Sequence, residues 1–229
     1  MKNVEVDAKS VYRKKLFIRI IKVILLFLII LVSVIYLFLY IVYDGGRFTV
    51  SLDKNLSNRK NIYLSEDGQL KNKTVKLSAD TIDYMDNISV HWLPNNLNNG
   101  TGSHNGDNYI AYSFYLINAG KEKVHYWYEL DVDDSIKRVD DAIRIMIYHN
   151  GNSTIYAKRN RVTNEPEPDT EAFKSNSVAV LKQVKNFKPK QKDKFTIVIW
   201  LEGDDPECKN DLLGGEIKMH MDLTEEHVE

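Results

Sequence analysis

The stretch Val23–Val42, with the sequence VILLFLIILVSVIYLFLYIV, decides how the whole chain is organised. It contains no charged residue, and Ser33 is its only small hydroxyl residue. A helix needs about 20 apolar residues to cross the hydrocarbon of a bilayer, so the stretch predicts a transmembrane helix over residues 23–43. The alternative is a cleaved signal peptide, whose apolar core is shorter and ends in a small-x-small site. Only the pair Gly45-Gly46 offers such residues, so we expect a retained signal anchor.

The residues on either side of this stretch predict its orientation. Basic residues precede it directly, namely Arg13, Lys14, Lys15, Arg19 and Lys22. Cytoplasmic flanks keep the positive charge, and tyrosines such as Tyr36, Tyr40 and Tyr43 favour the headgroup region at the other end. The sequence therefore predicts a single-pass cell-membrane protein with residues 1–22 in the cytoplasm and its C-terminal domain outside the cell.

The charge of the chain is divided unevenly about the apolar stretch. Seven of the 31 basic and two of the 32 acidic residues precede residue 43, which leaves 24 basic and 30 acidic residues after it. An acidic outer domain would repel phosphate backbones, so we expect no nucleic acid partner. The single cysteine, Cys208, excludes an internal disulfide. We expect a buried, inert thiol, although one unpaired cysteine can also crosslink two chains.

Beyond residue 46 the sequence alternates with a period of two, which is typical of half-buried strands. Ile217, Met219, Met221 and Leu223 alternate with polar residues, and Val124–Val132 and Ile143–Ile147 behave alike. The runs 109–117 and 195–201 are apolar at nearly every position, so both of their faces should be covered. Shorter strands are expected at 47–52, 75–77, 88–93, 154–158 and 178–184. About ten strands between polar turns predict an all-β, jelly-roll β-sandwich ectodomain at residues 61–229.

Residues 44–60 are expected to form a linker that includes a donor strand. Phe48, Val50 and Leu52 alternate just beyond the membrane. Such a strand can pair with the exposed sheet edge of a neighbouring molecule. It is therefore our candidate partner-binding segment.

An acidic loop directly after the strand 195–201 is the most unusual local feature. Glu202, Asp204, Asp205 and Glu207 lie within six residues. Calcium prefers several carboxylate and carbonyl oxygens in a loop, so these four residues are the candidate metal ligands. The alternative is a solvent-exposed turn that carries these charges, and in that case no cofactor is bound. Asp131, Asp133 and Asp134 form a second, weaker acidic patch.

No catalytic motif accompanies these features. The six histidines never stand one helical turn apart with a glutamate between them, as zinc proteases of the common type require. A Gly-rich phosphate loop, a nucleophile elbow and a Cys-His pair are also absent from the sequence. We therefore expect that the protein is not an enzyme.

The stretch IWLEGDDPEC at 199–208, followed by LLGGEIKM at 212–219, resembles the C-terminal end of camelysin/TasA-like surface proteins of Gram-positive bacteria. Upstream, AIRIMIY at 142–148 and YAK at 156–158 are similar to the same group. The residues that carry the motif are Trp200, Gly203, Pro206, Cys208, Gly214 and Gly215. The resemblance implies a jelly-roll domain outside the cell and, in TasA-like members, assembly into biofilm-matrix fibres by strand donation. This chain differs at its front end, where it retains its helix.

Two functions follow as hypotheses. The first is a membrane-anchored structural or adhesive domain that assembles with itself or with other surface proteins. The second is a carbohydrate-binding module, in which the Asn-rich loop 95–108 and the aromatic residues Tyr126 and Trp127 recognise a sugar. A camelysin-like metallopeptidase comes third, because the sequence has no zinc motif to support it.

Overall fold

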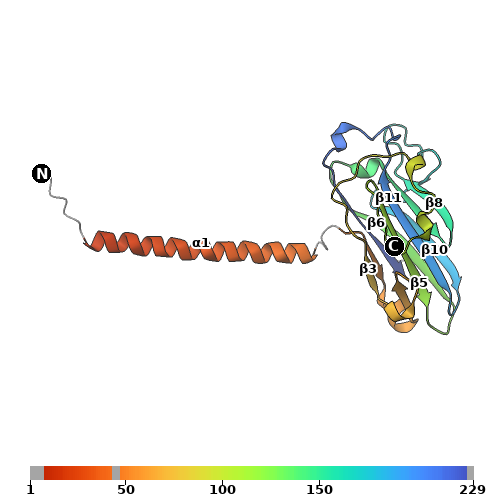
Figure 1. Ribbon diagram of the computed structural model, residues 1–229, viewed down its shortest axis with the longest axis horizontal. Helices are drawn as coiled ribbons and strands as arrows, with labels where there is room; N and C mark the ends of the chain where they lie inside the picture. Colours follow the sequence, from red (N-terminus) through yellow and green to blue (C-terminus); the bar gives the residue numbers. More distant parts are fainter. Residues whose placement is uncertain (1–7, 43–46, 226–229) are drawn as a thin grey trace. The chain divides into compact units, whose positions relative to one another are not determined.

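The computed structural model describes residues 8–42 and 47–225, and the chain divides into two compact units, 1–45 and 46–229. The predicted linker residues 44–46, Tyr43 and the first seven residues of the cytoplasmic segment lie outside the described residues. The first unit is the single helix α1 (Ala8–Val42), labelled in Figure 1. The candidate span is Val11–Tyr40, and an 18-residue window within it has a mean hydropathy of 3.1, which fits a signal anchor or a signal peptide. Ser33 donates its hydroxyl to the carbonyl of Ile29, so its polar group is satisfied within the helix.

The second unit contains a five-stranded and a seven-stranded sheet, which Figure 1 shows as two layers. The five-stranded sheet has the order β10 (Val178–Phe187), β6 (Val124–Ser135), β12 (Ile217–Thr224), β1 (Thr49–Leu52) and β3 (Lys76–Ser78). Neighbours are antiparallel except β1 and β12, which are parallel with Thr49 opposite His220. The first and last strands of the domain therefore lie side by side.

The other sheet has the order β2 (Ile62–Ser65), β5 (Ile110–Asn118), β11 (Lys192–Leu201), β7 (Ile143–His149), β8 (Asn152–Ala157) and β9 (Glu171–Ala172). The short strand β4 (Gly102–Ser103) also pairs with β5, and β8 and β9 are parallel. Both sheets are thus mixed. The predicted sandwich-like β domain is confirmed, whereas the finer jelly-roll topology is not shown by this strand order.

The core lies between the two sheets. The alternating residues of β6 and β12 are buried on one side, and Ile143, Ile145 and Ile147 of β7 face them. Direct contact between the layers is seen where the ring of Tyr128 on β6 meets Phe195 on β11 edge-on, at a centroid distance of 5.3 Å. This packing is the reason for the period of two in the sequence.

A second apolar cluster covers the opposite face of the seven-stranded sheet. Ala111, Met146, Val198 and Trp200 project outward from the strands. The segment that includes Ile88, Leu93 and Leu97 packs over them. As predicted, both faces of the central strands β5 and β11 are therefore buried. The predicted strand at 88–93 was wrong: the segment forms the 3₁₀ helix η4 (Val90–Trp92), because it caps a sheet face rather than joining an edge.

The remaining turns are short helical segments. They are η2 (Asn55–Arg59, a π turn) and the 3₁₀ helices η3 (Leu70–Asn72), η5 (Leu97–Asn99), η6 (Val139–Asp141) and η7 (Asn210–Leu212). The sequence predicted neither these segments nor the strands β2, β4 and β9. Such short elements carry too few residues to show a period.

Candidate functional site

Arg144 is a buried cation on the seven-stranded sheet. Since the neighbouring Ile143 and Ile145 point into the core, Arg144 points to the outer face of β7, where it lies opposite Trp200 of β11. It is only 5% exposed. A buried guanidinium requires hydrogen-bond acceptors or opposite charges around it. The carbonyl of Ile143 accepts one bond from Nη1 at 3.4 Å, so most of the compensation must come from elsewhere.

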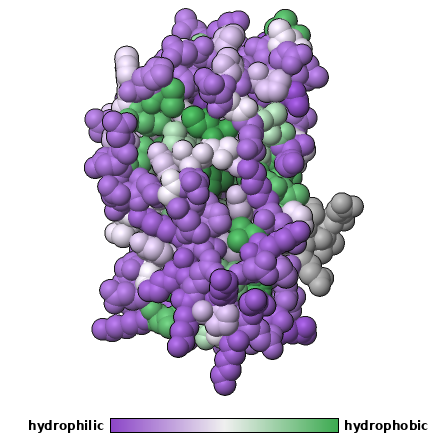
Figure 2. Space-filling view, turned by 90° about the vertical axis from the view of Figure 1, so that its right-hand side faces the viewer, coloured by the Kyte–Doolittle hydropathy of each residue, from purple (hydrophilic) through white to green (hydrophobic). Residues whose placement is uncertain are grey.

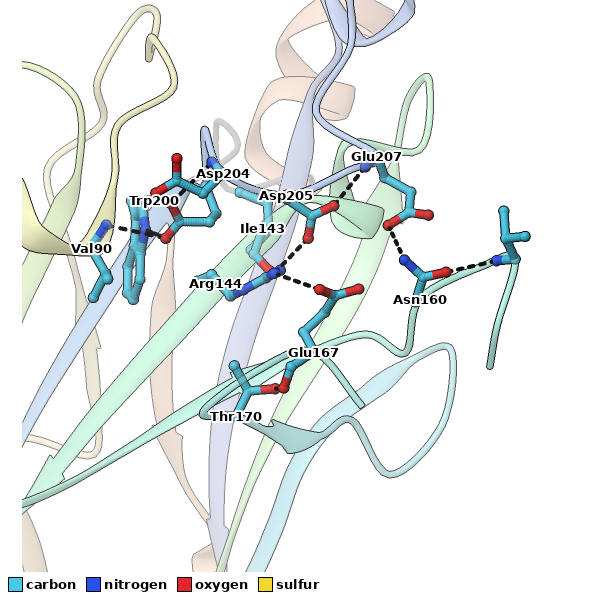
Figure 3. Close-up of polar contacts among 12 residues, drawn as sticks. Val90, Ile143, Arg144, Asn160, Glu167, Thr170, Trp200, Asp204, Asp205 and Glu207 are labelled. Carbon is cyan, nitrogen blue, oxygen red and sulfur yellow. Dashed lines mark hydrogen bonds and ion pairs between the residues drawn. The ribbon is translucent and has the colours of Figure 1, made fainter. Parts of the chain in front are cut away.

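Two loops supply the opposite charges. Asp205, from the loop after β11, places Oδ2 2.5 Å from Nη2 of Arg144. Glu167, from the loop between β8 and β9, places Oε2 3.5 Å from the same nitrogen. Both carboxylates are more than nine-tenths buried. Arg144 thus joins two loops that are far apart in the sequence, as Figure 3 shows.

Glu207 brings a third carboxylate to the same place. One oxygen from each of Glu167, Asp205 and Glu207 lies within 4.8 Å of the others. Asn160 donates its side-chain amide to Glu207 at 3.3 Å, and the backbone N–H of Glu207 donates to Asp205 at 2.7 Å. Burial, together with hydrogen bonding to Asp205 and its charge, raises the pKa of Glu207. We call Glu167, Asp205 and Glu207 the carboxylate triad.

Two oxygen atoms of the triad lack hydrogen bonds. Oε1 of Glu167 is buried and accepts no hydrogen bond, and Oδ2 of Asp205 contacts Arg144 as an ion pair without hydrogen-bond geometry. In Figure 3, the free oxygen of Glu167 is turned away from Arg144 and towards the side where Glu207 lies. Buried carboxylate oxygens normally have partners. These two oxygen atoms can therefore still bind a further positively charged group.

The structure separates the four predicted metal ligands. Asp205 and Glu207 join the triad, but Glu202 accepts hydrogen bonds from Trp200 Nε1 at 2.9 Å and from the backbone of Val90 at 3.2 Å. The carboxylate of Asp204 accepts a hydrogen bond from Ser89 at 2.7 Å. Glu202 and Asp204 thus fasten the segment around η4 to the acidic loop instead of facing the triad.

Sequence reasoning missed Arg144 and Glu167. A signal was present for Arg144, because it is the one charged residue in the strand IRIMIYH, where its neighbours on the same face are apolar or aromatic. For Glu167 the two flanking prolines, Pro166 and Pro168, indicate a fixed loop. Nothing in the sequence indicates that this loop meets residues 205–207.

A pocket of about 480 Å³ opens beside the triad. Its lining includes Arg144, Glu167, Trp200, Glu202 and His91. The wall therefore combines carboxylates, one guanidinium and an indole. Such a surface is suited to a cation or to a small polar ligand.

The residues on which the resemblance rests lie from the end of β11 to the turn before β12. Trp200 is fully buried beneath the acidic loop, and Pro206 lines the pocket. Gly215 is needed for close packing, because a Cβ there would lie 2.2 Å from Val139 Cγ1 and 2.8 Å from the carbonyl oxygen of Ile136. At Gly203 a Cβ would lie 2.7 Å from Nδ2 of Asn87, which is the end of a flexible side chain. Gly214 has a positive φ of 69°.

Cys208 is half-buried and packs against the small cluster of Val139, Ala142 and Leu212. Burial raises the pKa of its thiol, and the charges of Asp205 and Glu202 raise it further. A raised pKa lowers the thiolate fraction, so the group is a poor nucleophile.

The proposed donor strand lies within its own sheet. Strand β1 is paired with β12 on one side and β3 on the other. Phe48, Val50 and Leu52 are all buried in the core between the sheets. Donation to a neighbour would therefore require β1 to leave these two partners, and the donor-strand hypothesis stays a prediction.

The second acidic patch surrounds His220 on the outer face of the five-stranded sheet. Hydrogen bonding to Asp222 and the charges of Asp133 and Asp131 raise the pKa of His220 to about 9, against an opposing effect of burial. Asp133 is the nearest, with Oδ1 2.7 Å from Nδ1 of His220. Burial and the charge of Glu129 raise the pKa of Asp131 to about 6.

The proposed sugar-binding aromatics are not both available. Tyr126 is fully buried and donates its hydroxyl to Asp193 at 2.7 Å, so its assignment to a binding surface was wrong. Trp127, the next residue, is half-buried. In the Asn-rich loop, Leu97 packs over the sheet and His104 bonds the carbonyls of Gly102 and Leu97.

Comparison with known proteins adds little. No protein-family model and no curated protein matches the chain. A partial likeness exists to the crystal structure of a β-glucosidase from Kluyveromyces marxianus in complex with glucose, with 14% identity and a TM-score of 0.25 over 53% of this chain. The chain spans 13% of the length of that enzyme. A likeness this weak carries no argument.

Proposed function

We propose that the chain is a membrane-anchored structural or adhesive protein that displays its β-sandwich domain outside the cell and assembles there with itself or with other surface proteins. The main support is that the chain contains both a helix long enough to span a membrane and a separate β unit with its own hydrophobic core. The basic residues of α1 all precede residue 23, which favours a cytoplasmic N-terminus. The β unit is then on the outer side.

The finer part of the proposal is a TasA-like, jelly-roll surface domain. It is supported by two glycines of the stretch that resembles these proteins, because Gly203 and Gly215 permit close packing near the acidic loop. It is also supported by the position of β1, which is the first strand after the membrane helix, carries the core side chains Val50 and Leu52 and directly follows the core residue Phe48. A strand of this kind is suited to exchange between neighbouring molecules.

Exposed apolar side chains give the proposal a candidate contact surface. Tyr84 is 79% exposed and Leu213 is 70% exposed, and both line one pocket at the surface of the β unit. Figure 2 shows that apolar areas interrupt a face that is otherwise mainly hydrophilic. Exposed aromatic and aliphatic side chains that lie together mark protein contacts more often than scattered ones do.

Protease treatment of intact cells tests the display. We expect the β unit to be digested while an epitope tag at the N-terminus is protected. Protection of the β unit in intact cells, or recovery of the full chain in the cytosol, would refute the proposal.

Chemical crosslinking of the full-length chain in the membrane tests the assembly. We expect the double variant Y84S/L213S to weaken crosslinked species about tenfold or more, as the loss of interface anchors does. The control is V162S, which removes an equally exposed apolar side chain that lines neither pocket. Equal crosslinking of all three proteins would exclude this surface.

Carbohydrate binding remains a second candidate because of one aromatic side chain. Trp92 is 75% exposed and follows His91, which lines the pocket beside Arg144. An exposed indole next to polar groups can stack on a sugar ring. Binding of the full-length protein to a glycan array, lost in W92A, would favour this candidate.

A further inference from the structure

We propose that the carboxylate triad of Glu167, Asp205 and Glu207 binds a calcium ion, which fastens the loop between β8 and β9 to the loop after β11. The proposal concerns the stability of the domain and is independent of the function proposed above. Figure 3 shows Glu167 and Asp205 beside Arg144, with Glu207 beyond Asp205.

The distances suit one shared ion. Calcium binds oxygen ligands at about 2.3–2.6 Å, so two oxygens on the same ion are at most about 5 Å apart. The three candidate oxygens of the triad lie within 4.8 Å of one another. A single ion can therefore reach all three with small adjustments of the side chains. Calcium tolerates such irregular geometry, whereas magnesium requires a near-ideal octahedron.

The unpartnered oxygen points to a ligand independently of the cluster itself. Glu167 is only 6% exposed, and its Oε1 accepts no hydrogen bond. Its other oxygen faces Arg144 at 3.5 Å, which fixes the side chain with Oε1 directed away from the guanidinium. A carboxylate oxygen held in this way is expensive to bury without a cation or a donor.

The local charge also favours a divalent ion. The triad holds three carboxylates, and one guanidinium pairs with two of them, which leaves a net charge of two negative units when all three are ionised. Among the residues that the structure describes, Arg144 is the only basic side chain that forms an ion pair with the triad. The nearby Lys158 contacts Asp140 and Asp141, and Arg161 lies 3.9 Å from Asp141. A Ca²⁺ ion would balance the remaining charge.

The sequence of the two loops makes the arrangement rigid enough to select an ion. Pro166 and Pro168 flank Glu167, and Pro206 lies between Asp205 and Glu207. Proline fixes φ, so less conformational entropy is lost when the ligands are held in place. The carbonyl of Glu167 is already engaged by Thr170, whose hydroxyl donates to it at 2.8 Å.

Thermal unfolding of the full-length chain in detergent tests the proposal, with calcium chloride added after treatment with a chelator. We expect calcium to raise the Tm of the β unit, because an ion that binds only the folded state stabilises it. In E167Q and E207Q the apparent affinity for calcium should fall by about tenfold or more.

The matched control is E165Q. Glu165 lies in the same loop two residues before Glu167, and its side chain is exposed. The E165Q protein removes the same charge and should keep the full calcium response. The absence of a calcium-dependent shift in the wild-type protein, or a shift of equal size in all four proteins, would overturn the proposal. An equal response to magnesium would overturn the assignment to calcium.

Discussion

Replacement of Arg144 by methionine is the sharpest test of how the two loops are held. The change removes the charge that contacts Asp205 at 2.5 Å and Glu167 at 3.5 Å, and both carboxylates stay buried. Removing one partner of a buried ion pair destabilises a protein by about 3–5 kcal/mol, because the other charge is left uncompensated. For a domain of this size each kcal/mol lowers the Tm by about 2–4 °C. We expect R144M to lower the Tm by roughly 6–20 °C.

Tryptophan fluorescence is the suitable assay for this variant. All three tryptophans, at positions 92, 127 and 200, lie in the β unit, so unfolding of that unit is observed without a contribution from α1. Urea titration in the presence of a chelator excludes an effect of bound calcium. Two controls accompany it: R144K keeps the charge and should lose less, and R161M removes a half-exposed partner of Asp141. A loss below about 1 kcal/mol in R144M, the range of surface ion pairs, would refute the reasoning.

Two further predictions concern the five-stranded sheet. The pKa of His220 is about 9 in the folded protein and about 6.5 in the unfolded chain, so its stabilising effect is complete below pH 6.5 and disappears as the pH rises through 9. The variant H220N should therefore show a smaller fall in the urea midpoint between pH 6.5 and 9.5 than the wild-type protein. An unchanged pH profile of the urea midpoint would contradict this assignment. Val50 is fully buried in the core, so V50A should lower the free energy of unfolding by about 2–3 kcal/mol; an unaffected urea midpoint would show that β1 does not pack in its own domain.

Several parts of the fold could be predicted from the sequence because they depend on local chemistry. The apolar part of α1, residues 23–42, follows from uninterrupted apolarity, whereas its first part, residues 8–22, contains six basic residues and was expected as a cytoplasmic segment. The strands β6, β7 and β12 follow from alternation. The double burial of β11 could be expected because nearly every residue in it is apolar. In contrast, the segment around Val90 has strand-like residues but forms a 3₁₀ turn, since its position is set by the acceptors of Glu202.

The candidate site could be predicted only in part for the same reason. Asp205 and Glu207 belong to one acidic loop, so the sequence placed both among the candidate calcium ligands. Glu202 and Asp204 are also carboxylates, but they accept hydrogen bonds from Trp200 and Ser89 instead. Which carboxylates meet is decided by the donors that surround each one, and these donors come from other elements.

By itself the sequence determined that the chain has one spanning-length apolar helix, an acidic remainder and a domain of alternating strands, because each of these follows from the free energy of transfer of neighbouring residues. The tertiary structure alone decided that β1 lies beside β12, that Arg144 is buried between Asp205 and Glu167, and that Glu167 completes the triad. The physical reason is that a buried charge is tolerated only where distant segments bring it partners. The spacing of residues in the sequence does not show which distant segments come into contact.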